Sequence, residues 1–185
     1  MESDELKRVE QRARLAYETS RLRRAIIAFA PILLLVIAAA LIGQRVRYTL
    51  ALGTALFTFG VVLLWYGRDI RRAVLPGVLA GLVPMAFALC AKHIGHGCTG
   101  DGCMTLCVPA CAAGGFLAGL AIHVAWFRHG RHSGFWVAAS VLTLLTGAMG
   151  CACAGLPGLV GLAVGFAAPA TTGLLVAALP QRSAV

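Results

Sequence analysis

The sequence predicts an all-α membrane protein, a bundle of six transmembrane helices preceded by an amphipathic helix in the cytoplasm. Two observations carry this prediction. Of the 185 residues, 59% are hydrophobic and only 12% are charged, whereas a soluble domain carries about 25% charged residues. Six apolar runs also recur along the chain without a single Lys, Arg, Asp or Glu, and each is long enough to cross a hydrocarbon layer of about 30 Å.

The six expected spans are 25–43, 48–66, 73–91, 108–127, 133–150 and 156–179. The last two are separated by the segment from Gly150 to Gly158, whose glycines and Pro157 are typical of a tight turn. Few residues remain outside the spans, which leaves no room for a soluble catalytic domain and makes an enzyme the less favoured interpretation.

Small residues and prolines inside the spans predict how the helices pack. Three Gly-x3-Gly pairs allow two backbones to approach closely, and they also permit self-association into a homo-oligomer. These pairs are Gly77 with Gly81, Gly115 with Gly119, and Gly161 with Gly165. Pro31, Pro84 and Pro169 should kink their helices, and neighbouring Thr or Ser side chains should bind the carbonyls that are freed.

The basic residues predict the orientation. With the N-terminus in the cytoplasm, 13 of the 16 Lys and Arg fall on the cytoplasmic side, and only Arg45, Arg47 and Lys92 fall on the other. Lys and Arg near helix ends prefer the cytoplasmic side, so both termini are expected there, in the inner membrane. The high pI of about 9.8 is therefore a topology signal, and nucleic acid is excluded as a partner.

The expected layout is a cytoplasmic helix at 1–24, a transmembrane domain at 25–179 with an outer loop at 92–107, and a cytoplasmic tail at 180–185. The acidic N-terminal segment is unlike a signal peptide, so the first span is expected to be retained. Its apolar positions, Leu6, Val9, Ala13 and Ala16, recur at helical spacing. This narrow stripe predicts binding to membrane lipid, to another copy of the chain or to a cytoplasmic protein.

The soft ligands of the chain gather at the outer side of this topology. Nothing comparable is expected on the cytoplasmic side. The group contains Cys90, His93, His96, Cys98, Cys103, Cys107, Cys111, Cys151 and Cys153, with Met85, Met104 and Met149 as weaker ligands. This set predicts a site for a soft metal ion such as copper, zinc or mercury, or for thiol oxidation.

The spacing of the cysteines restricts how they combine. Cys98 and Cys103 flank a turn that would close a small disulfide loop or present two thiolates to one ion. Cys107 and Cys111 share a helix face but are too far apart for an easy bridge, so we expect them to meet Cys151 and Cys153. We also place Cys107 and Cys153 at helix N-termini, where the helix dipole favours thiolate. Structural disulfides remain the simplest alternative in an oxidising compartment.

The arrangement of a short charged N-terminus, six helices rich in small residues and cysteines near the outer ends of late helices resembles small membrane-embedded anti-sigma factors. The resemblance implies that the N-terminal helix sequesters a sigma factor. It also implies that Cys107, Cys111, Cys151 and Cys153 are the sensing thiols. This chain differs in having more cysteines and a very short cytoplasmic segment.

Three functions follow from these observations. The first is a sensor or regulator in which the outer cluster binds a metal or is oxidised and the cytoplasmic helix responds. The second is capture or transport of a soft metal, since the composition is similar to that of small mercury-uptake membrane proteins. No acidic residue lies within any span to relay an ion. The third is a quinone-linked thiol oxidoreductase, which the absence of a Cys-x2-Cys pair disfavours.

Overall fold

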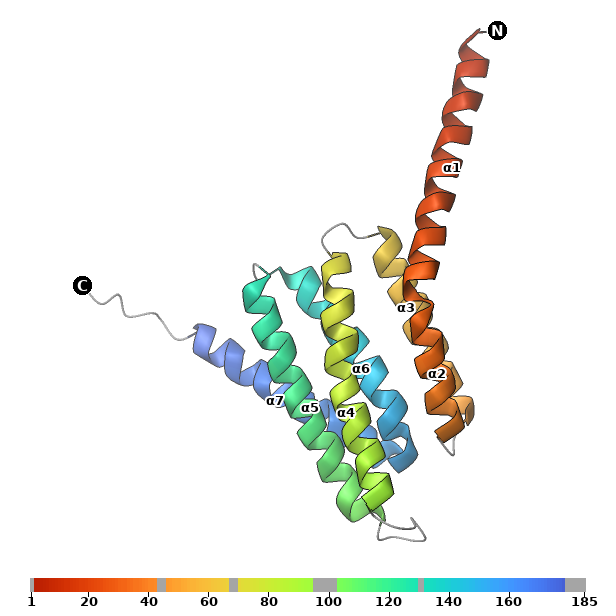
Figure 1. Cartoon of the computed structure of the whole chain (residues 1–185). Coiled ribbons are helices and arrows are strands. Elements are labelled where there is room, and N and C mark those ends of the chain that lie inside the picture. Colours follow the sequence, from red (N-terminus) through yellow and green to blue (C-terminus); the bar gives the residue numbers. More distant parts are fainter. Residues whose placement is uncertain (1, 43–45, 67–69, 95–102, 130–131, 179–185) are drawn as a thin grey trace, which may run out of the picture.

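The computed structural model describes residues 2–42, 46–66, 70–94, 103–129 and 132–178 (Figure 1). These residues form seven α-helices and two short 3-10 helices. The α-helices are α1 (Glu2–Phe29), α2 (Pro31–Ile42), α3 (Val46–Tyr66), α4 (Val74–Ile94), α5 (Cys103–Arg128), α6 (Ser133–Cys151) and α7 (Leu156–Ala178). The 3-10 helices are η1 (Ile70–Ala73), before α4, and η2 (Ala152–Ala154), between α6 and α7.

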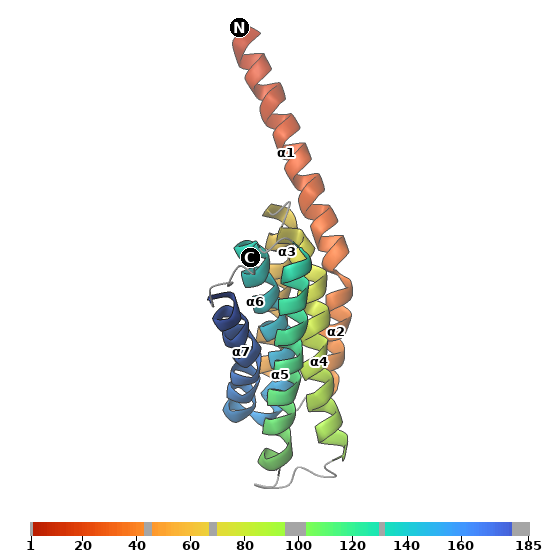
Figure 2. The ribbon, with the colours of Figure 1, turned by 90° about the vertical axis from the view of Figure 1, so that its left-hand side faces the viewer.

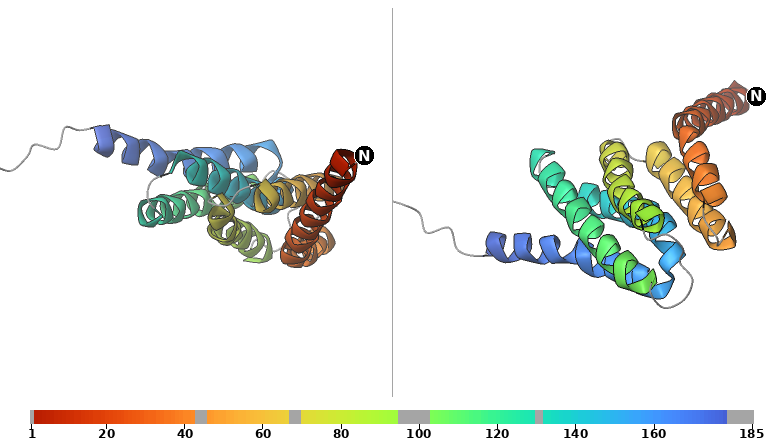
Figure 3. Two further views of the ribbon diagram at one scale, coloured as in Figure 1. Left: turned by 90° about the horizontal axis from the view of Figure 1, so that it is seen from above. Right: turned by 60° about the horizontal axis from the view of Figure 1, so that its bottom comes forward.

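The helices α2 to α6 run side by side, and α1 continues beyond the end of the bundle (Figures 1 and 2). The most extensive contacts join α5 to α7, α4 to α6 and α4 to α5. The helix α3 packs on α6 and carries α1 and α2 on its other side. In the views of Figure 3, α1 to α3 therefore lie at one side of the bundle and α5 and α7 at the other.

Most of the expected spans are found as helices that are long and apolar enough to cross a membrane. Four segments of the described chain are long and apolar enough to cross a membrane: Val46–Trp65, Ile70–Ala91, Leu106–Arg128 and Ser133–Cys151. The pair formed by α1 and α2 makes a fifth when its two arms, bent by 41°, are taken as one broken span. The apolar segment found in α7 is the shorter Leu156–Pro169.

The first span begins differently from the prediction. No helix boundary falls at residue 24, because α1 continues to Phe29 and the break comes at Ala30. Proline has no backbone N–H and a fixed φ, which suits the first position of a helix, so Pro31 starts α2 and the predicted kink is found there. Side chains 7–20 of α1 are exposed, so Val9, Ala13 and Ala16 of the predicted amphipathic stripe are not buried in the bundle.

The expected close approach of helices at glycines is confirmed. A Cβ added to Gly115 would lie 2.5 Å from the carbonyl oxygen of Leu162 in α7, and one on Gly161 would lie 3.1 Å from that of Val108 in α5. In the same way, a Cβ on Gly77 would lie 2.9 Å from the carbonyl oxygen of Ala139 in α6. The Gly-x3-Gly pairs of α4, α5 and α7 thus lie where the backbones of neighbouring helices approach closely.

The prolines of α4 and α7 lie inside continuous helices. Pro84 packs between Gly114 and Gly147, whose lack of a side chain leaves space for its ring. The Thr143 hydroxyl lies 2.9 Å from the carbonyl oxygen of Gly77 in α4 and 2.8 Å from that of Ala139 in its own helix. The carbonyl that Pro84 frees is that of Ala80, four positions before it, so this is not the contact that the sequence predicts. This polar contact lies in the buried interface of α4 with α6.

Three buried clusters form the core. One joins α1, α2, α3, α4 and α6 around Leu56, Leu142 and Met149. A second lies where α5, α6 and α7 meet, and includes Ile122 and Phe166. The third contains Ala88, Cys111, Ala148, Cys151 and Leu162, so that four different helices each bring a side chain to it. This last cluster positions the candidate site.

Candidate thiol site

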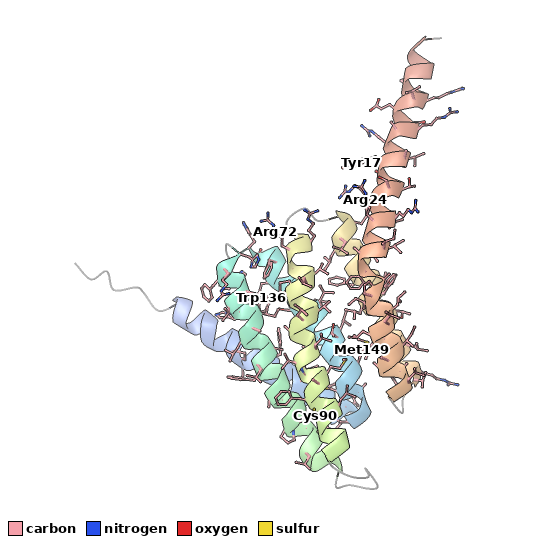
Figure 4. All side chains as sticks on the ribbon, in the orientation of Figure 1. Tyr17, Arg24, Arg72, Cys90, Trp136 and Met149 are labelled. Atoms are coloured by element: carbon pink, nitrogen blue, oxygen red, sulfur yellow. The ribbon has the colours of Figure 1, made fainter. Side chains whose placement is uncertain are left out.

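The two ends of the bundle differ in chemistry. Figure 4 places Cys90 at the end where α4 finishes, and Tyr17, Arg24 and Arg72 at the opposite end. We call these the cysteine end, where α4 and α6 finish and α5 begins, and the arginine end, where α3 finishes and α4 begins. The soft ligands of the described residues thus lie apart from the arginines of α1 and η1, as the sequence predicts.

The centre of the candidate site is the pair Cys111 and Cys151. Both side chains are 0% exposed and packed in one buried cluster, where the two thiols lie within reach of a side-chain hydrogen bond. They come from α5 and α6, 40 positions apart in sequence. Ala88, Ala148 and Leu162 surround them. The structure therefore brings together one member of each expected cysteine group.

Glycines position the end of α6, which carries Cys151. A Cβ on Gly150 would lie 2.7 Å from Cα of Met85, so α6 approaches α4 one residue before Cys151. A Cβ on Gly158 would lie 2.7 Å from the carbonyl oxygen of Cys151, and Gly155 adopts the positive φ of 71° that glycine accepts without strain. The tight turn predicted at 150–158 is thus found, and it folds α7 back under Cys151.

Cys107 lies one helical turn from Cys111 on the same face of α5 and is 5% exposed. The expectation that it occupies a helix N-terminus is wrong, because α5 begins four residues earlier, at Cys103. The field of a helix dipole falls off within the first turn. Any activation of Cys107 must therefore come from its neighbours and not from the helix end.

The remaining soft ligands divide into three groups. Cys90 is exposed on α4, whereas its neighbour Ala88 contacts the thiol pair. Met149 is buried in the cluster around Leu142, and Met85 lies against Gly150. His96 and Cys98 lie outside the described residues, as do the side chains of His93, Cys103, Met104 and Cys153. None of the four described cysteine side chains is in a disulfide.

Two buried thiols in contact can undergo two kinds of chemistry. They can be oxidised to a disulfide, for which the sulfurs must approach from hydrogen-bonding distance to about 2.05 Å. They can instead bind a soft cation as thiolates, as Cu(I) prefers. Among the described residues no group of three or more His, Cys, Asp or Glu side chains is placed to hold a metal ion.

The stripe expected to bind a partner is exposed where the structure describes it. Val9 is 64% exposed, and Ala13 and Ala16 are also exposed, while the side chain of Leu6 lies outside the described part of the chain. Sequence reasoning took the arginines only as topology signals and missed a cavity that Arg21, Arg24 and Arg71 line together. The helical spacing of Tyr17, Arg21 and Arg24 is the signal that could have revealed its α1 wall.

Comparisons with models of protein families, with curated proteins and with solved structures found no match.

Proposed function

We propose that this chain is an integral membrane sensor in which oxidation of Cys111 and Cys151 changes the packing of the cysteine end. The single observation that supports this proposal is the packing of these two thiols together in one fully buried cluster. Disulfide formation there would join α5 to α6 by a covalent bond where the structure has only packing. Because protein interiors are close-packed, the cluster around the pair must rearrange when the sulfurs approach.

The proposed setting is the inner membrane, with both termini in the cytoplasm and α7 as a sixth span. The arginine end would then face the cytoplasm and the cysteine end the opposite, oxidising compartment. The length of α7, which extends over 23 residues, supports a sixth span. The exposed stripe at Val9, Ala13 and Ala16 would hold a cytoplasmic protein, such as a sigma factor, or lie on the lipid surface.

The proposed chemistry is thiol–disulfide exchange with a small disulfide. The sulfur of Cys111, as thiolate, attacks one sulfur of the reagent, the S–S bond of the reagent breaks, and one thiol leaves with the proton of Cys111. Cys151 then attacks the mixed disulfide, and the second reagent thiol leaves with its proton. Two electrons and two protons pass from the protein to the reagent. Both sulfurs are fully buried, so the cysteine end must open for each reaction.

The path from the thiol pair to α1 runs through packed helices. Cys151 ends α6, and Thr143 of the same helix contacts Gly77 of α4. The helix α6 also packs on α3, and α3 carries α1. A shift of α6 on oxidation would therefore reach α1 through α3. In this proposal, the redox state of the thiol pair at the cysteine end is coupled to the position of α1 at the arginine end.

The test is titration of the purified full-length protein, reconstituted in lipid, with oxidised glutathione. We expect a loss of two mass units and a cross-linked peptide that contains Cys111 and Cys151. Cys111→Ser and Cys151→Ser should each prevent this product, whereas Cys90→Ser, at the exposed cysteine of the same end, should not. An unchanged pair after exhaustive oxidation, or a product that links other cysteines alone, would overturn the proposal.

The sensing step needs its own measurement. Hydrogen exchange of the same preparation, reduced and oxidised, should change in α6, in α3 and in the last turns of α1. Exchange that changes only around the two cysteines would contradict signalling through α1. Deletion of residues 1–24 should abolish binding of a cytoplasmic partner, and unchanged binding would contradict the role of the stripe.

A second candidate function is capture of a soft metal ion. The pair of Cys111 and Cys151 favours it, because two thiolates can hold Cu(I) between them. Titration of the reduced protein with Cu(I) against a competing chelator, repeated with Zn²⁺ and Hg²⁺, would measure it. Tight stoichiometric binding that Cys111→Ser and Cys151→Ser each weaken would support capture. Binding that Cys111→Ser and Cys151→Ser leave unchanged would exclude the pair as its site.

A further inference from the structure

A cavity of about 420 Å³ lies at the arginine end, between α1, the last turn of α3 and η1. Three arginines line it, Arg21 and Arg24 from α1 and Arg71 from η1, together with Tyr17 and Ser20. The four residues from α1 follow one another at helical spacing and so share one face of that helix. The cavity is therefore a basic site assembled from segments that are far apart in sequence.

One of the three arginines is held in place. Arg21 donates a hydrogen bond to the carbonyl oxygen of Trp65 in the last turn of α3, and its guanidinium lies 5.8 Å from the ring centroid of Tyr17. A guanidinium has five N–H donors, so these contacts leave donors for a ligand. A side chain that is already ordered loses little conformational entropy on binding.

The charge of the cavity is uncompensated by the described residues that line it, since none of them is acidic. The described ion pair of α1, between Arg14 and Glu10 at 3.1 Å, lies farther along the helix, away from the bundle. Three positive charges that converge on one cavity repel each other, and an anion in the cavity would relieve this repulsion.

The position of the cavity indicates which anion it meets. Arg24 directly precedes the apolar run that starts at Ala25, and Arg71 precedes the run of α4. Leu64, which also lines the cavity, lies near the end of the span Val46–Trp65. All three spans thus begin or end beside the cavity, at the depth where phosphate headgroups lie in a bilayer.

We propose that this cavity binds a phosphate ester, with Arg24 and Arg71 as its ligands and Arg21 as the anchored third cation. The fork of a guanidinium matches two oxygens of a phosphate, and such charge-assisted hydrogen bonds are among the stronger ones. An anionic phospholipid headgroup and a free phosphate share this chemistry. If these arginines served only to orient the protein in the membrane, they would need to lie at this end of the bundle. They would not need to line one cavity.

The test uses the full-length protein in detergent, with native mass spectrometry of bound phosphatidylglycerol and phosphatidylcholine. We expect selective retention of phosphatidylglycerol. The double variant R24Q/R71Q should weaken it at least about tenfold. The matched control R23Q/R72Q removes the same charge from the adjacent positions, neither of which lines this cavity, and should change affinity less than about twofold.

Competition by soluble anions distinguishes a lipid headgroup from a free phosphate as the ligand. If glycerol 1-phosphate or inorganic phosphate at micromolar concentration displaces the lipid from wild type but not from R24Q/R71Q, the ligand is a free phosphate. If neither displaces it, the ligand is the lipid headgroup. Equal weakening by the two double variants, or equal retention of the two lipids by wild type, would overturn the proposal. Circular dichroism of both variants verifies that the helices are intact.

Discussion

Gly165 of α7 lies directly against the main-chain carbonyl of Ala112 in α5. A Cβ on Gly165 would overlap this oxygen, and because the obstacle is backbone it cannot move aside as a side chain would. This contact lies in the most extensive helix interface of the described chain. The approach of α5 to α7 therefore depends on the absence of a side chain at this position.

Gly165→Ala should destabilise the protein by about 1–3 kcal/mol, because the added methyl group forces the two helices apart. Gly134→Ala is the matched control, since its Cβ would meet Ile70 at the ordinary distance of 3.6 Å. We expect the control to change stability by less than about 0.5 kcal/mol. Reversible unfolding in mixed micelles measures both variants, and equal stability of the two would contradict this role of Gly165.

Thr143→Val should weaken the interface of α4 with α6. Valine has nearly the same shape but cannot donate to the Gly77 carbonyl, and hydrogen bonds between membrane helices contribute about 0.6 kcal/mol on average. Thr146→Val is the control, because the hydroxyl of Thr146 donates to Leu142 in its own helix, at 2.8 Å. Unfolding should show a larger loss for Thr143→Val, and a larger loss for the control would refute the interhelical role.

Arg21→Ala should loosen the attachment of α1 to α3. It removes the hydrogen bond to Trp65 and the contact with Tyr17, and a hydrogen bond from a charged group contributes about 1.5–3 kcal/mol. We expect faster hydrogen exchange in the last turns of α1 and unchanged exchange in α5. Arg23→Ala, at an exposed neighbouring position, should leave both unchanged. Equal exchange in the two variants would show that α1 is held by other contacts.

Ser140→Ala should be neutral or stabilising by up to about 1 kcal/mol. The Ser140 hydroxyl is buried on α6 without a hydrogen-bond partner in the described structure, and burial of an unsatisfied polar group destabilises a fold. Ser133→Ala, at the exposed start of α6, serves as reference. A clear loss of stability for Ser140→Ala alone, measured by the same unfolding assay, would mean that its hydroxyl has a partner.

Much of the fold follows from local features of the sequence. Charge-free runs predict α3 to α6 because burying an unpaired charge in hydrocarbon is costly, and the Gly-x3-Gly pairs predict which faces pack closely. The long α1 is different: nothing in the apolar pattern shows that the helix crosses from the charged segment into the span without a break. The end of α1 just before Pro31 is local and predictable.

The candidate site is less accessible to sequence reasoning. Spacing excludes an easy bridge between Cys107 and Cys111, and so predicts a partner from the turn after α6, but it does not select Cys151. Which of Cys151 and Cys153 faces Cys111 depends on how α7 folds back at Gly155 and Gly158. The basic cavity illustrates the same point. Arg24 and Arg71 are 47 positions apart, and they line one cavity because α1 and η1 both pack on α3.

The length of α1 has a mechanical consequence. A helix of 28 residues extends about 42 Å at 1.5 Å per residue. If it pivots at its junction with α2, a rotation of only about 10° moves its far tip by roughly 7 Å, more than one helical pitch of 5.4 Å. A small rotation of α1 at the bundle thus becomes a large displacement of its far end. A protein bound to that end could distinguish the two positions.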